Sequence, residues 1–142
     1  MSEVGIHRKG EVNLQDLLRR LRETSGKEVG AIGCFIGVVR GESRKGEEVK
    51  FLSCESAEEA GEKLGKIADD VESRPSIKQV MIHHVVDRLS PGEDVVYVLV
   101  SGKNRSDVFR ALSDIMDKVK TEVPIWKKEI TTSGEYWAHE TR

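Results

Sequence analysis

The feature that most constrains the fold is an amphipathic helix expected between Ser106 and Pro124. Ser106 can cap its first turn, and Pro124 must end it because proline has no N–H to continue the hydrogen-bond ladder. Between these limits, apolar side chains recur at i, i+3, i+7, i+10 and i+14 and form one helical stripe: Phe109, Leu112, Met116, Val119 and Val123. This stripe makes the segment the best-defined element of the chain.

Further strands and helices are expected around this helix. Asn13 can cap a leucine-rich helix that Gly26 ends, and Ser56 and Glu59 have the spacing of a capping box before a second helix. Strands are predicted at 29–41 and 49–55, which should pair antiparallel, at 77–89 and 93–102, after Pro124, and in the closing TSGEYW segment. This order predicts an α+β fold: one domain over residues 1–142, with a mixed, largely antiparallel sheet and about three helices.

Composition excludes several classes of protein. The chain has 142 residues and is 34% charged, yet 23 basic residues face 25 acidic ones, and this balance argues against a nucleic-acid-binding protein. There is no apolar signal core and no run near the ~20 apolar residues of a membrane span, so we expect a soluble, cytoplasmic protein without a membrane partner. Cys34 and Cys54 lack zinc-site spacing and are expected to be reduced, buried thiols.

The segment KTEVPIWKKEI (120–130) concentrates lysines around a helix end. Lys120 flanks the apolar stripe, and beyond Pro124 strand alternation places Lys127 on one face with Glu129 and Lys128 on the other. Lys120 and Lys127 are therefore expected to converge at one corner, where Arg40 and the loop 103–105 could join them. Such a cluster suits a phosphate or carboxylate ligand. Solvated lysines at an edge are the alternative interpretation.

Two other polar groups could support chemistry. His83 and His84 resemble a metal-binding pair, but successive strand residues point to opposite faces, so no metal site is predicted. The basic loop SGKNRSD (101–107) opens the last helix, where free backbone N–H groups favour an anion. An ordinary exposed capping loop explains that signal equally simply.

Four segments share a characteristic order and spacing: GVVRG (37–41), HHVVDRLSPGEDVVYVLVSG (83–102), NRSDVFRAL (104–112) and MDKVKTEVPIWKKE (116–129). An apolar strand ending in G-x-V-R, followed later by a helix leading into L-K-x-x-x-P-[IF]-W-K-[KR]-E, is the pattern of the molybdopterin synthase large subunit. The chain resembles that family over about residues 30–137.

The resemblance implies an α/β hammerhead fold and an enzyme of molybdenum or tungsten cofactor biosynthesis. It implies a homodimer in which each protomer binds a small ubiquitin-like sulfur carrier, giving a 2:2 heterotetramer. The carrier's C-terminal Gly-Gly thiocarboxylate would supply sulfur to cyclic pyranopterin monophosphate, forming the dithiolene of molybdopterin. No metal or redox cofactor is implied for this step. The alternatives are a homologue that binds the carrier without this chemistry, and an unrelated nucleotide binder with a basic pocket.

The resemblance also assigns roles to residues of this chain. It implies that Lys120 and Lys127 are catalytic. It further implies that Arg40, Arg105 and Glu129 bind the substrate, and we expect Lys103 and Asn104 of the basic loop to join them. Two positions depart from the family pattern, because Asn104 replaces a histidine and His84 replaces an arginine. These departures affect the acid–base details and the substrate contacts.

Overall fold

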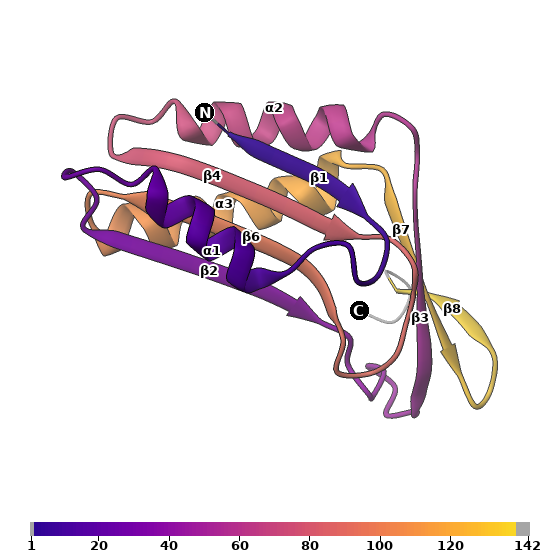
Figure 1. Ribbon diagram of the computed structural model, residues 1–142. Coiled ribbons are helices and arrows are strands. Elements are labelled where there is room, and N and C mark those ends of the chain that lie inside the picture. The colour runs from indigo at the N-terminus through magenta and orange to yellow at the C-terminus, as the bar shows by residue number, and fades with distance from the viewer. Residues whose placement is uncertain (1, 139–142) are drawn as a thin grey trace.

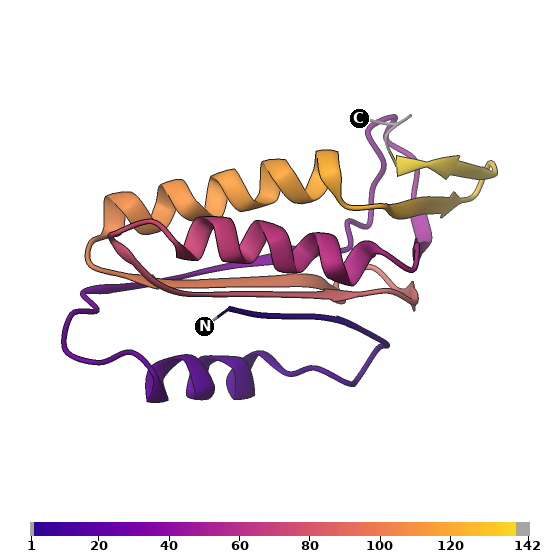
Figure 2. The same cartoon turned by 90° about the horizontal axis from the view of Figure 1, so that it is seen from above.

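The computed structural model describes residues 2–138. Within this range the chain forms eight strands and three helices, which are α1 (Leu14–Glu23), α2 (Ala60–Glu72) and α3 (Arg105–Glu122). Helices α2 and α3 lie side by side on one face of a sheet, and α1 covers the opposite face (Figure 2). None of the described helices is long and apolar enough to cross a membrane.

The strands form two sheets of four. The first has the order β1 (Glu3–His7), β4 (Ile77–Val85), β6 (Asp94–Gly102) and β2 (Ala31–Val38). The second has the order β5 (Arg88–Leu89), β3 (Val49–Ser56), β7 (Ile125–Thr131) and β8 (Glu135–Trp137), and it stands at the end of the first sheet (Figure 1). Every pairing between these strands is antiparallel except that of β1 with β4. The α+β fold with mixed, mostly antiparallel sheets is therefore confirmed.

The strand pairing differs from the prediction in two respects. The predicted hairpin between 29–41 and 49–55 is wrong, since β2 pairs with β6 and β3 pairs with β7. Strand β2 lies under α3 because Gly33 allows a close approach: a Cβ there would lie 2.6 Å from Val108 Cγ1. Strand β1 was not predicted, because EVGIH contains only two apolar residues, Val4 and Ile6, and gains its place by parallel pairing with β4.

The apolar face of α3 is rotated relative to the predicted stripe. Its buried residues are Val108, Ala111, Ile115 and Val119, whereas Phe109 is 65% exposed. The residue before the helix, Asn104, provides the cap in place of Ser106. The predicted end is confirmed: the helix stops at Glu122, two residues before Pro124. Lys120 is consequently held in the last turn, next to the start of β7.

Of the two caps predicted for the first two helices, one is confirmed and the other is wrong. The Asn13 side chain accepts a hydrogen bond from the Asp16 N–H, so the predicted cap of α1 is confirmed. Ser56, predicted to cap the second helix, is instead the last residue of β3. Helix α2 begins at Ala60, and Glu59 at its cap position makes no side-chain capping bond.

The core lies mainly between the first sheet and helices α2 and α3. Ile82 of β4 and Val98 of β6 belong to the same buried cluster as Leu64 of α2 and Ile115 of α3. Cys54 is buried in a smaller cluster where the two sheets meet, as predicted. The prediction for Cys34 is wrong, because β2 is an edge strand and leaves this thiol exposed.

Candidate functional site

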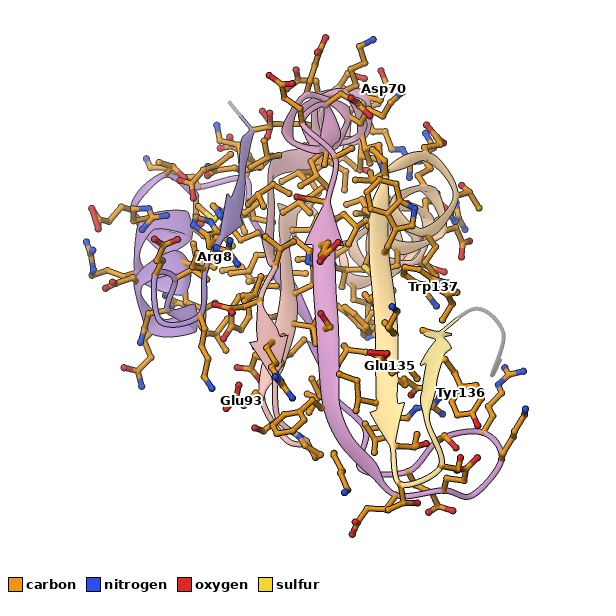
Figure 3. All side chains as sticks on the ribbon, turned by 90° about the vertical axis from the view of Figure 1, so that its right-hand side faces the viewer. Arg8, Asp70, Glu93, Glu135, Tyr136 and Trp137 are labelled. Atoms are coloured by element: carbon orange, nitrogen blue, oxygen red, sulfur yellow. The ribbon has the colours of Figure 1, made fainter. Side chains whose placement is uncertain are left out.

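A pocket of about 410 Å³ opens where α3 ends and β7 begins. Lys120 comes from the last turn of α3, Lys127 from β7 and His84 from the end of β4. Trp126 and Trp137 complete the rim and are 49% and 37% exposed. Figure 3 views the molecule from this end, with Trp137 on β8 beside β7. We call this cavity the lysine pocket; the structure brings Lys120 and Lys127 together in it, as the sequence predicted.

A second, smaller hollow of about 120 Å³ adjoins the lysine pocket. It is lined by Arg40, Lys127 and Glu129, so Lys127 contributes to both cavities. Glu129 is buried, whereas Arg40 is exposed just beyond the end of β2. The predicted grouping of these three side chains is therefore present in the structure. It places a guanidinium and an ammonium around a cavity that can receive an anionic group.

Lys128 lines neither of these two cavities, although it contacts a residue of the rim. Its ammonium sits over the ring of Trp137, 4.8 Å from the ring centroid. Lys128 and Trp137 are directly paired across β7 and β8. Strand alternation thus separates the two neighbouring lysines, with Lys127 in the pocket and Lys128 stacked on an aromatic ring.

His84 is a residue of the pocket that sequence reasoning missed. Its Nδ1–H donates to the Val85 carbonyl oxygen at 3.0 Å, and its side chain is 2% exposed. Burial, and secondarily the positive charge of Lys127, lowers the pKa of His84 to about 3. The ring is therefore neutral at physiological pH. The sequence did contain a signal for this position. Side chains alternate between the two faces of a strand, so one of two adjacent histidines must point to the side of the sheet that carries α3.

His83 lies on the other face, in a separate polar network. Its Nε2–H donates to Glu3 at 2.6 Å, and its Nδ1 lies 2.8 Å from Nε2 of His7. Arg20 of α1 pairs with the same carboxylate at 2.5 Å. Burial lowers the pKa of His83 in spite of the neighbouring Glu3. These contacts tie β1, β4 and α1 together, and no cluster of three or more metal-ligating side chains occurs within residues 2–138.

The loop 103–105 does not reach the lysine pocket of its own chain. It lies at the start of α3, and 18 helical residues separate the two ends by about 27 Å. Lys103 lines a different hollow of about 300 Å³ with Glu28 and Lys78. The expected convergence of Lys103, Asn104 and Arg105 with Lys120 and Lys127 is therefore wrong within one chain, because the helix is straight and long.

The Asn104 side chain is occupied by helix capping. Its Oδ1 accepts from the Asp107 N–H at 2.9 Å, and its Nδ2 donates to the Asp107 carboxylate at 3.0 Å. We expect Asn104→Ala to lower the free energy of unfolding by about 1 kcal/mol, the usual cost of losing such a cap. Urea unfolding followed by circular dichroism measures this. Asn104→Asp, which keeps the acceptor, is the control, and equal stability of the alanine variant and the wild type would contradict the capping role.

Comparison with known proteins shows the family to which this chain belongs. The MoaE protein family model matches residues 7–122. A probable molybdopterin synthase of Haloferax volcanii is 34% identical over 142 residues, covering 98% of this chain but only 54% of the relative, so the chain spans about half of that protein's length. The molybdopterin synthase catalytic subunit of Pyrococcus abyssi is 34% identical over 138 residues, covering 96% of this chain and 90% of the relative.

A solved structure shows the same relationship in three dimensions. The molybdopterin biosynthesis MoaE protein of Burkholderia ambifaria superposes with a TM-score of 0.79 at 34% identity, covering 96% of this chain and 88% of that one. The sequence match includes the segments that form the lysine pocket up to the end of α3. The chain therefore belongs to the MoaE protein family, whose named relatives include molybdopterin synthase catalytic subunits.

Proposed function

We propose that this chain is the catalytic subunit of a molybdopterin synthase and acts in the cytoplasm. It would transfer sulfur from the C-terminal thiocarboxylate of a ubiquitin-like carrier to cyclic pyranopterin monophosphate, forming the dithiolene of molybdopterin. The observation that carries the proposal is the lysine pocket, where two ammonium groups from α3 and β7 face one cavity. Two relatives of this chain are named as molybdopterin synthases.

The lysine pocket suits the end of an extended peptide. Its inner wall is apolar, formed by residues such as Met116, Val119 and Val123, and its rim carries two tryptophans. A flexible Gly-Gly tail has no side chains to exclude it from such a cavity. Once the thiocarboxylate carbon is attacked, a negative charge develops on its oxygen. Lys120 and Lys127 can stabilise that charge by donating hydrogen bonds in a partly desolvated cavity.

The adjoining hollow suits the anionic part of the pterin substrate. Arg40 offers a guanidinium for phosphate recognition, and Lys127 lies between this hollow and the lysine pocket. Glu129 is buried beside them and offers an acceptor to N–H groups. This arrangement would place the pterin next to the carrier's terminal carbon.

A second copy of the chain is required if Lys103, Asn104 and Arg105 bind substrate, since they lie far from the pocket of their own chain. The edge strand β2 exposes Phe35, Ile36 and Val38, an apolar surface that suits self-association. We expect a homodimer alone and a 2:2 complex with the carrier. Size-exclusion chromatography with light scattering measures both masses, and a monomer at micromolar concentration would contradict this assembly.

The direct test of the function is product formation. The purified chain is incubated with thiocarboxylated carrier and cyclic pyranopterin monophosphate, and the dithiolene is detected as its oxidised fluorescent derivative. Carrier with an ordinary carboxylate is the matched control and should give no product. If the carrier binds but no dithiolene forms, the chain is a carrier-binding homologue without this chemistry.

The two thiols should be dispensable, because the transferred sulfur arrives on the carrier. Cys54 is buried, and burial raises the pKa of its thiol to about 11, so little thiolate exists at neutral pH. Cys34 lies on an edge strand away from the lysine pocket. We expect a Cys34→Ser, Cys54→Ala double variant to keep its turnover. Loss of activity in a folded double variant would instead show that a cysteine takes part in the transfer.

A further inference from the structure

His84 is a buried imidazole on the wall of the lysine pocket with a fixed orientation. It occupies the second-last position of β4, on the face that packs against α2 and α3. Its Nδ1–H is committed to the Val85 carbonyl oxygen at 3.0 Å. A neutral imidazole with a proton on Nδ1 has a lone pair on Nε2, so His84 brings a hydrogen-bond acceptor to the pocket.

The cation best placed for this acceptor is Lys127. It is half-buried on the pocket side of β7, and its charge acts on His84, where it reinforces the effect of burial on the pKa of the ring. Lys120 is exposed at the edge of the same pocket. Because His84 is already neutral at physiological pH, it can accept a hydrogen bond from an ammonium without a change in its own charge.

Lys127 also borders the hollow that contains the buried carboxylate of Glu129. A flexible ammonium beside a single carboxylate would be drawn toward that carboxylate and away from the carrier tail. An acceptor in the lysine pocket would offset this attraction. The direction of the Lys127 side chain would then be set by two groups, Glu129 in one cavity and His84 in the other.

We propose that His84 is a positioning residue for sulfur transfer, whose Nε2 accepts a hydrogen bond from the Lys127 ammonium and holds it toward the carrier's thiocarboxylate. This inference rests on the proposed function. His84 touches neither the substrate nor the reacting atoms; it acts through Lys127. It follows that an acceptor is required at position 84, and that a titrating group is not.

The first test compares two variants of similar size. His84→Leu fills the space but has no acceptor, whereas His84→Gln can present its Oε1 near the position of Nε2. Loss of one hydrogen bond to a charged group should slow turnover about 10- to 100-fold in His84→Leu, without weakening carrier binding. His84→Gln should recover most of the rate. Wild-type turnover in His84→Leu, or equal loss in both variants, would overturn the proposal.

The second test asks whether His84 acts through Lys127. In a Lys127→Ala background, His84→Leu should cause no further loss of the residual single-turnover rate. If the fold-losses in rate of the two single variants multiply in the double variant, His84 acts independently of Lys127, and the positioning role would be wrong.

A third measurement does not depend on turnover or on changing His84. Imidazole ¹⁵N NMR of the wild-type protein should show the neutral Nδ1–H tautomer of His84, and Lys127→Ala should shift its Nε2 resonance. Lys128→Ala, which removes the neighbouring lysine stacked on Trp137, is the matched control and should leave that resonance in place. A wild type that makes no dithiolene would refute the proposed function alone. An Nε2 resonance unmoved by Lys127→Ala would overturn the hydrogen bond.

Discussion

Lys127→Ala and Lys120→Ala are each expected to slow sulfur transfer by ~10²–10³-fold, the usual effect of removing one donor to a developing oxyanion. The two ammonium groups reach one pocket from different elements, so neither can replace the other. Neither lysine is part of the buried core. Both variants should therefore fold and bind the carrier normally. Single-turnover dithiolene formation with saturating carrier measures the effect on the chemical step.

Lys128→Ala is the matched control for these variants. Its ammonium stacks on Trp137, on the face of β7 away from Lys127, so its removal should cost no more than about tenfold in rate. Circular dichroism and carrier binding confirm that all three variants are folded. A Lys128→Ala variant as slow as the other two would show that the assignment of faces along β7 is wrong.

Acidification is expected to destabilise the protein through His84. The folded-state pKa of His84 is about 3, whereas the unfolded chain has the ordinary value near 6.5. The unfolded state therefore binds a proton below pH 6.5 that the folded state does not bind until about pH 3. The free energy of unfolding is therefore unaffected by this titration above pH 6.5 and decreases as the pH falls toward 3. At pH 4 the loss is on the order of 3 kcal/mol. Burial of His83 acts in the same direction.

Urea unfolding of the wild type and of His84→Gln at pH 7 and pH 4 isolates this contribution. Carboxylates titrate in both proteins, so the difference between their pH dependences reports on His84 alone. The wild type should lose more stability on acidification than the variant. Parallel losses in the two proteins would show that His84 is not held neutral in the folded state.

The lysine pocket could be predicted from the sequence because local rules determine it. Pro124 ends α3 two residues after Glu122, and period-two alternation then directs Lys127 and Lys128 to opposite faces. Both rules act over a few residues and do not depend on the rest of the fold. The relation between Lys120 and Lys127 therefore follows from the segment 120–130 alone.

The predictions that were wrong concern residues whose position depends on segments far away in the sequence. The exposure of Cys34 follows from the edge position of β2, which depends on its pairing with β6 some 60 residues later. The separation of Arg105 from Lys127 follows from α3, which begins at Arg105 and carries the chain away from it for its whole length. In the sequence His84 stands out only as one of two adjacent histidines. It becomes part of the pocket because the end of α3 and the start of β7 lie beside the end of β4.

The most direct test of the central claim locates the carrier's C-terminus on this chain. A carrier whose terminal carboxylate has been activated will acylate a lysine that lies next to it, and peptide mass spectrometry identifies that lysine. We expect the first adduct to form on Lys120 or Lys127. Lys128 should stay unmodified, although it follows Lys127 directly in the sequence. An adduct that forms first on Lys128 or Lys103, or equally on many surface lysines, would contradict the assignment of the lysine pocket as the site of sulfur transfer.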